Sequence, residues 1–219
     1  MTIKALLFDF DGTIADSSSG IIASIRYAFD KNNAGGDVTD EDIKNAIGPP
    51  LIPLIERILG EKADEEVVKK IALSFREYYT EEGLFMAGLY EGVEKTLKFL
   101  SVKYTLFVVS SKPEEFLKKL MSALGVRKYF KGIYGPGLGL TPLKKAELIK
   151  ACMAENNLKA DECIMIGDKA EDVAAAKVNG VKTVGVLYGF GTAAELNEAG
   201  AACLIEKPED LIKLNYANI

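Results

Sequence analysis

A short apolar run near the N-terminus, Ala5 to Phe8, ends abruptly in Asp9, with Asp11 and Gly12 close behind. An uninterrupted apolar run of this length is typical of a strand buried in a parallel sheet, and ligands bind beyond the carboxyl ends of such strands. On extended chain Asp9 and Asp11 project to the same side, where two carboxylates repel unless a cation lies between them or one stays protonated. A strand that simply ends in a polar Asp-Gly turn is the alternative interpretation.

After Ser17 the pattern changes from strand-like to helical. Apolar residues recur at helical spacing over 17–32, 51–59 and 63–81, and Thr39 with Asp42 has the form of a capping box for a short helix ending near 47. No strand pattern occurs between 17 and 84. We therefore expect an α/β core domain formed by residues 1–16 and 88–219, with an all-helical domain, residues 17–87, inserted into it.

Strands and helices alternate again in the remaining chain. Apolar, strand-like runs occur at 104–109, 133–135, 163–166, 183–187 and 202–205, and helical segments are expected at 92–100, from 113 to Gly125, at 141–156, 170–178 and 192–198, and at the C-terminus. Alternation of this kind predicts an α/β fold with a doubly wound, mainly parallel sheet.

Composition excludes several classes of chemistry. The 219 residues include no histidine, so Ser-His-Asp and Cys-His nucleophiles and histidine-bound zinc are excluded, and proton transfer must use carboxylates, lysine or tyrosine. The net charge of −5 argues against nucleic acid as a partner. No signal peptide or membrane-length apolar run is apparent, and Cys152, Cys163 and Cys203 are expected to be buried free thiols, so we expect a cytoplasmic protein.

Polar residues also follow two later strands. Ser110 and Ser111 close one apolar run, where a hydroxyl could bind an anion near a helix N-terminus or could serve as an N-cap. Asp168 closes another, followed by Glu171 and Asp172. An N-cap Asp168 with Glu171 in a capping box is the alternative there.

Two lysines stand at an unusual place in a predicted helix. Lys144 and Lys145 fall in the first turn after Thr141-Pro142, where the helix dipole disfavours cations, so the pair points to anion binding unless it is a solvated surface pair. Four polar strand or helix ends on one parallel sheet would converge at one edge, which favours a common site.

Four segments together resemble the motifs of the haloacid dehalogenase-like (HAD) hydrolase superfamily, in its phosphatase form. DFDGTIADS resembles the first motif, VVSSKPEE the second, KKAELI a variant of the third and IGDKAEDVAAAKVNG the fourth. The segments LYEGV, TVGVLYGFG and AELNEAGA are similar to parts of phosphoglycolate phosphatase-like members. The resemblance covers nearly the whole chain and implies a Rossmann-like core with an inserted helical cap.

The resemblance also implies roles for individual residues. Asp9 would attack phosphorus to form an aspartyl-phosphate, and Asp11 would protonate the leaving oxygen and then activate water. Mg²⁺ would be held by Asp9, the backbone carbonyl of Asp11, and Asp168, with Asp172 behind them. The phosphoryl group would contact Ser110, Ser111, Lys145 and the backbone at Gly12 and Thr13. Lys145 is preferred as the motif lysine because it directly precedes Ala-Glu, although Lys144 stays possible.

The resemblance favours a phosphatase for a small phosphorylated metabolite, most like phosphoglycolate phosphatase. A β-phosphoglucomutase-like sugar mutase shares every motif, pyrophosphatases and nucleotidases belong to the same group, and an idle HAD domain acting as a binding module is the non-enzymatic alternative. No membrane or nucleic-acid partner is expected, and the chain would be a monomer or a weak homodimer.

By the same resemblance, the helical cap would determine substrate specificity. Its loop from Ile47 to Leu51 is the expected substrate-facing stretch, unless it is a plain helix-breaking turn. Arg26, Arg57 and Arg76 are candidates for an anionic substrate group, with nothing to choose among them.

Overall fold

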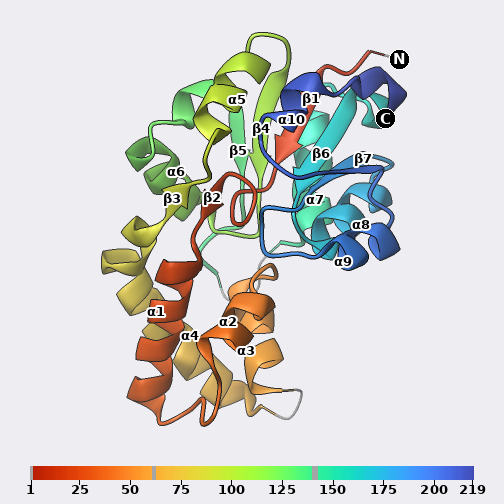
Figure 1. Cartoon of the computed structure of the whole chain (residues 1–219). Coiled ribbons are helices and arrows are strands. Elements are labelled where there is room, and N and C mark those ends of the chain that lie inside the picture. The colour runs from red at the N-terminus through yellow and green to blue at the C-terminus, as the bar shows by residue number, and fades with distance from the viewer. Residues whose placement is uncertain (1, 61–62, 140–142) are drawn as a thin grey trace. The chain divides into compact units, whose positions relative to one another are not determined.

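The chain forms two compact units, which are described separately. The computed structural model describes residues 2–60, 63–139 and 143–219 (Figure 1). One unit comprises Met1–Asp16 and Leu89–Ile219 and is called the α/β unit; the other, Ser17–Gly88, is called the helical unit.

The α/β unit is built on a six-stranded sheet in which every strand pair is parallel. The strand order is β5-β4-β1-β6-β7-β8. The strands are β1 (Ala5–Phe8), β4 (Thr105–Val109), β5 (Gly132–Tyr134), β6 (Cys163–Gly167), β7 (Lys182–Val186) and β8 (Cys203–Ile205). From β1 the chain builds outward through β4 and β5, then returns to the other side of β1 for β6. The sheet therefore reverses its winding at β1, where open α/β sheets bind ligands.

Helices connect successive strands of this sheet, and one more follows the last strand. They are α5 (Val93–Leu100), α6 (Glu114–Ala123), α7 (Lys145–Glu155), α8 (Ala170–Val178), α9 (Ala193–Ala199) and α10 (Asp210–Lys213), with 3₁₀ turns at Arg127–Tyr129, Ala160–Glu162 and Tyr216–Asn218. Two further short strands, β2 (Ala15–Asp16) and β3 (Gly88–Leu89), pair with each other where the chain leaves and re-enters the α/β unit.

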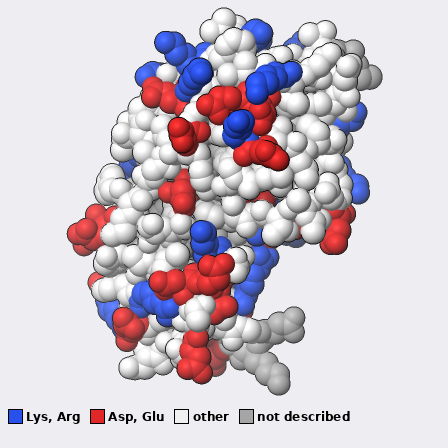
Figure 2. All heavy atoms as spheres, viewed as in Figure 1, with Lys and Arg blue, Asp and Glu red and all other residues white. Residues whose placement is uncertain are grey.

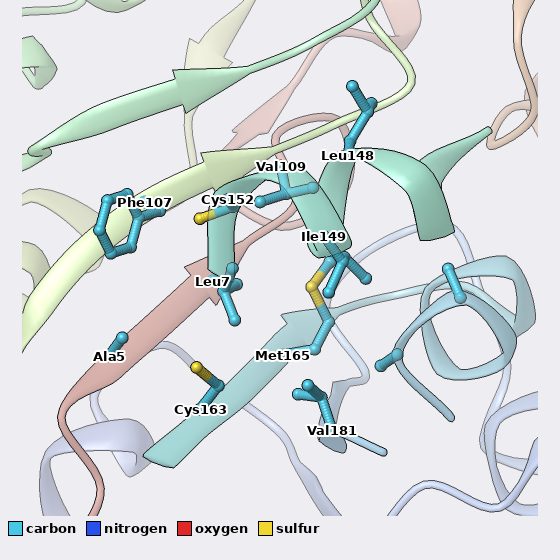
Figure 3. Close-up of a cluster of buried hydrophobic side chains, with 12 residues drawn as sticks. Ala5, Leu7, Phe107, Val109, Leu148, Ile149, Cys152, Cys163, Met165 and Val181 are labelled. Atoms are coloured by element: carbon cyan, nitrogen blue, oxygen red, sulfur yellow. The ribbon is translucent and has the colours of Figure 1, made fainter. Parts of the chain in front are cut away.

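The central strands are buried on both faces. On one face, side chains from β1, β4 and β6 pack against α7, as Figure 3 shows for Leu7, Met165 and Cys152. The alternate residues of β1, Leu6 and Phe8, are also buried. Burial of both faces explains why the strands read as continuous apolar runs instead of alternating ones.

The strand register brings three chain segments level beyond the sheet. Phe8 of β1 is paired with Val108 of β4 and with Ile166 of β6. Asp9 therefore follows β1 at nearly the same height as Ser110 follows β4 and Asp168 follows β6. The sheet itself gathers polar residues that are far apart in the sequence, since Ser110 and Asp168 both lie more than a hundred positions from Asp9.

The helical unit contains α1 (Ser18–Asn32), α2 (Asp40–Ala46), α3 (Leu51–Leu59), α4 (Glu65–Glu81) and a 3₁₀ turn at Gly83–Met86. The predicted capping box is confirmed, since the Asp42 N–H donates to Thr39 Oγ1 at 3.1 Å and the Thr39 N–H donates to Asp42 Oδ2 at 2.8 Å. Helix α1 and the 3₁₀ turn approach closely, because a Cβ on Gly20 would lie 1.9 Å from the Gly83 carbonyl oxygen.

The predicted fold class is confirmed: a parallel α/β sheet is interrupted by a helical region. Most elements lie within two residues of their predicted limits, and α8 matches its prediction at both ends. The short strands β2 and β3 were not predicted, since two residues carry no periodicity. The predicted start of α7 at Thr141-Pro142 lies outside the described residues, and the described helix begins at Lys145.

Surface charge, the cysteines and the helix lengths can be compared with the expectations from the sequence. Acidic and basic side chains are intermixed on the face drawn in Figure 2. Cys152 and Cys163 are free and buried as predicted, whereas Cys203, also free, is partly exposed. Among the described residues, no helix combines the length and the apolar character needed to cross a membrane.

We expect Gly20→Ala to lower the free energy of unfolding by about 1–3 kcal/mol, because its Cβ would overlap a backbone oxygen that cannot move aside. The helix propensity gained by alanine, about 1 kcal/mol, offsets only part of this cost. Thermal unfolding followed by circular dichroism measures the change. Gly88→Ala is the matched control, since its Cβ meets open space; equal melting temperatures for the two variants would contradict the prediction.

Candidate active site

Asp9 lies at the centre of the polar cluster beyond the sheet. Its backbone N–H donates to the Ile166 carbonyl at 2.9 Å, which ties it to the end of β6, and only 5% of the residue is exposed. Burial raises the pKa of its carboxyl to about 6, and the charges of Asp172 and Asp11 add to this rise. Lys145 and a hydrogen bond with Ser110 act in the opposite direction and favour the carboxylate.

Lys145 joins two of the carboxylates. Its Nζ lies 3.1 Å from Asp9 Oδ1 and 2.5 Å from Asp172 Oδ1, with 7% of the side chain exposed. The contact with Asp9 is an ion pair without hydrogen-bond geometry, so Asp9 Oδ1 has no hydrogen-bond partner. Burial alone would lower the pKa of Lys145, but the charges of Asp172 and Asp9 outweigh it and the pKa is raised. Lys144 is exposed at the N-cap position, so only Lys145 reaches the cluster.

Asp172 projects from the first turn of α8 and is fully buried. Its Oδ2 accepts a hydrogen bond from the Lys169 N–H at 3.0 Å, while its Oδ1 faces Lys145. The alternative interpretation of Asp168 as an N-cap is wrong, because Lys169 occupies the N-cap and Asp172 is its N3 residue. A Cβ on Gly167 would lie 2.4 Å from Asp172 Cγ, so this approach requires glycine.

Asp168 is also fully buried, and other groups hold its carboxylate in place. Thr13 Oγ1 donates to Oδ1 at 3.1 Å, and the Phe190 N–H donates to Oδ2 at 2.8 Å. Gly12 and Gly189 approach so closely that a Cβ on either would lie 2.1–2.4 Å from an atom of Asp168. Burial, followed by the charges of Asp172 and Asp9, raises the pKa of this carboxyl well above its ordinary value.

Asp11 takes part in an ion pair that the sequence reasoning missed. Lys112 Nζ lies 2.9 Å from Asp11 Oδ2, and the two side chains are 5% and 16% exposed. The one available signal was that Lys112 directly follows Ser110 and Ser111, next to the expected start of a helix at 113. Tyr188 was also missed; its hydroxyl donates to the Thr13 carbonyl at 3.1 Å.

Of the residues predicted to bind phosphate, Gly12 and Thr13 use their backbone N–H groups for other hydrogen bonds, and Ser111 is more exposed than Ser110. The Gly12 N–H donates to the Ala15 carbonyl at 3.0 Å, and the Thr13 N–H donates to the Phe10 carbonyl at 3.3 Å. Ser111 is partly exposed next to buried Ser110. That these three residues bind phosphate stays a prediction. The Thr13 side chain is instead hydrogen-bonded to Asp168.

The carboxylates fit a divalent cation. Asp9, Asp168 and Asp172 each offer an oxygen, and these three oxygens lie within 4.8 Å of one another. Asp9 Oδ1 is buried without a hydrogen bond, which is costly unless another ligand reaches it. Counting Asp11, four carboxyl groups lie beside the two ammonium groups of Lys145 and Lys112, so two negative charges would stay unbalanced with all four ionised. An oxygen-only set of this charge is suited to Mg²⁺.

Comparison with known proteins gives consistent results. A family model described as haloacid dehalogenase-like hydrolase matches residues 6–186. A 5'-nucleotidase of Pseudomonas aeruginosa is 35% identical over 87% of this chain and 86% of its own length. A phosphoglycolate phosphatase of Colwellia psychrerythraea is 28% identical over 90% of each chain. The tyrosine-protein kinase PtkA of Mycobacterium tuberculosis is 30% identical over 87% of this chain, but the match spans only 64% of PtkA.

Among solved structures, a predicted phosphatase from Clostridium acetobutylicum superimposes with a TM-score of 0.89 and 31% identity, covering 98% of this chain and 100% of its own. The sheet order, the buried aspartates and these matches agree. The chain belongs to the haloacid dehalogenase-like hydrolase family and is a phosphatase of that family.

Proposed function

We propose that the protein is a Mg²⁺-dependent phosphatase that hydrolyses a small phosphorylated metabolite through an aspartyl-phosphate on Asp9. The observation that carries this proposal is the buried Lys145 between Asp9 and Asp172, at the end of the strand where the sheet reverses its winding. An ammonium group 3.1 Å from Asp9 Oδ1 favours the ionised carboxylate that a nucleophile needs.

The surrounding residues have complementary tasks. One Asp9 oxygen forms a bond to phosphorus while the bond from phosphorus to the leaving oxygen breaks. Asp11 gives its proton to that oxygen, then accepts one from the water that hydrolyses the aspartyl-phosphate. Ser110 and Lys145 would share the negative charge of the phosphoryl oxygens, since both groups are buried beside Asp9.

Asp9 and Asp168 would hold the metal, together with the backbone carbonyl of Asp11, and Asp172 would stand behind them. When bound, Mg²⁺ supplies positive charge that offsets the carboxylates and the phosphoryl oxygens. The hydrogen bonds from Thr13 and Phe190 keep the Asp168 carboxylate oriented for this task before the metal arrives.

Two classes of substrate have specific support. The 35% identity with a 5'-nucleotidase favours 5'-mononucleotides, and the 28% identity with a phosphoglycolate phosphatase favours phosphoglycolate. We propose that the helical region 17–87 serves as the cap that selects between them. Of its three candidate arginines, Arg26 forms an ion pair with Asp40 at 2.7 Å within the helical unit.

The test is release of inorganic phosphate from a panel of 5'-mononucleotides, phosphoglycolate, pyrophosphate, sugar phosphates and an aryl phosphate. We expect Asp9→Asn to reduce the rate by about 10⁴-fold or more, because the amide is not a nucleophile. Asp161→Asn, at an exposed carboxylate, is the control. Phosphate migration without release, dependent on a sugar bisphosphate, would indicate the mutase instead. A folded wild-type protein inactive on the whole panel would support a binding module.

A second prediction separates the two neighbouring lysines. Lys145→Met should lower kcat/KM by about 10²–10³-fold, as the loss of one preorganised donor to a developing charge does elsewhere. Lys144→Met should change it by less than about twofold, because the Lys144 side chain is exposed outside the cluster. Steady-state kinetics on the best substrate of the panel measure both. Equal losses of kcat/KM in the two variants would contradict the prediction that only the lysine beside the carboxylates takes part in catalysis.

Metal binding can be tested without activity. Mg²⁺ at about 100 times its dissociation constant should raise the free energy of unfolding by about 2.7 kcal/mol, provided that the unfolded chain does not bind it. Asp168→Asn should abolish most of this stabilisation, whereas Asp161→Asn should retain it. Thermal unfolding with Mg²⁺ and with a chelator gives the comparison. A shift that persists in Asp168→Asn would place the ion elsewhere.

A further inference from the structure

Lys112 is a buried cation that the proposed reaction does not use. It follows β4, and its Nζ lies 2.9 Å from Asp11 Oδ2 with 5% of the side chain exposed. Removing an ammonium group from water is costly unless a carboxylate and good geometry compensate. Because this lysine is buried, it does not serve to keep the protein surface soluble, and its pairing with Asp11 calls for another role.

The backbone of Lys112 is held in place on two sides. Its N–H donates to Ser110 Oγ at 3.3 Å, so it shares a turn with a predicted phosphate-binding hydroxyl. Its carbonyl oxygen packs against Gly135, where a Cβ would lie only 2.5 Å away. The ammonium group is therefore presented to Asp11 from a turn with little freedom to shift.

This arrangement ties the Asp11 side chain to a different strand from its own. Asp11 belongs to the segment after β1, whereas Lys112 and Ser110 belong to the segment after β4. The ion pair thus links the orientation of the Asp11 carboxylate to the place where Ser110 would hold the phosphoryl group. A proton donor has to be oriented toward the leaving oxygen, and a misplacement of 1 Å can cost about 10²-fold in rate.

We propose that Lys112 is a positioning residue for Asp11: its ammonium group holds Oδ2, and the other carboxyl oxygen of Asp11 carries the proton that is given to the leaving oxygen. This role rests on the proposed phosphatase function. In the step concerned, Asp9 forms the bond to phosphorus, the leaving oxygen departs with the bonding electron pair, and that oxygen receives its proton from Asp11. Lys112 itself transfers no proton.

The dependence of kcat/KM on the leaving group distinguishes a positioning role from a merely structural one, because a structural defect would lower kcat/KM for all substrates alike. A sugar phosphate releases a basic alkoxide that needs the proton, whereas 2,4-dinitrophenyl phosphate releases an anion stable without it. The value of kcat/KM reports steps up to the transfer of the phosphoryl group to Asp9, and so excludes the later hydrolysis by water. The ratio of the two kcat/KM values therefore isolates the protonation step.

The experiment compares Lys112→Met with Asp11→Asn and with Lys169→Met on glucose 6-phosphate, phosphoglycolate and 2,4-dinitrophenyl phosphate. Lys169 is the matched control, since it is a buried lysine paired with Glu195 at 3.4 Å. We expect Lys112→Met to lower kcat/KM by at least about tenfold on the two alkyl phosphates and by less than about threefold on the aryl phosphate. Asp11→Asn should show the same selectivity more strongly, and Lys169→Met no selectivity.

A loss of kcat/KM of equal size on all three substrates would overturn the role of Lys112. A loss confined to phosphoglycolate would overturn it too. Because phosphoglycolate carries a second negative charge, that result would identify Lys112 as a substrate-binding lysine. An inactive wild-type protein would instead overturn the phosphatase function and this role with it.

Two further variants keep the test decisive if Lys112→Met does not fold. Lys112→Arg retains the positive charge and should recover most of the activity on alkyl phosphates. Gly135→Ala keeps Lys112 but displaces its backbone, and should reproduce the selective loss. Circular dichroism confirms folding of each variant, and a Gly135→Ala enzyme without selectivity would overturn the proposal.

Discussion

Asp9, Asp168 and Asp172 hold three carboxylate groups together in a space almost without water. Two unit charges no more than 4.8 Å apart, at an effective dielectric constant of about 20, repel by roughly 3.5 kcal/mol or more, so the cluster is stable only with compensating charge. Lys145 compensates two of the three at once. Burial, together with the charges of the neighbouring carboxylates, raises the pKa values of Asp9 and Asp168 despite the ammonium group of Lys145. The cluster therefore concentrates negative charge that a bound cation would offset.

The backbone, more than the side chains, decides where these charges lie. The parallel register sets Asp9 and Asp168 level at the ends of adjacent strands. Glycines then permit distances that any other residue would prevent, as Gly12 does for Asp168 and Gly167 does for Asp172. The geometry of the cluster is thus determined by the sheet and its turns before any ligand is bound, which is what preorganised electrostatic catalysis requires.

The sequence predicted the sheet, the inserted helical region and the convergence of polar strand ends, because uninterrupted apolar runs and capping residues are local signals. It preferred Lys145 to Lys144 only through the family resemblance, since both lie in one helical turn and only the direction of the side chain separates them. It missed the pairing of Lys112 with Asp11, which joins residues 101 positions apart and depends on how two strands lie side by side. The position of Asp168 was predicted, but its hydrogen bonds to Thr13 and Phe190 depend on loops without periodicity.

The chain leaves the α/β unit along β2 and returns along β3, and these two short strands are paired with each other. The two ends of the insertion are therefore neighbours, whatever lies between them. An insertion of another length or architecture could begin and end at the same pair without altering the order of the six-stranded sheet. Evolution can in this way exchange the part of the molecule between β2 and β3 while the chemistry beyond β1 is inherited unchanged, and recombination in the laboratory could use the same junction to create chimeras.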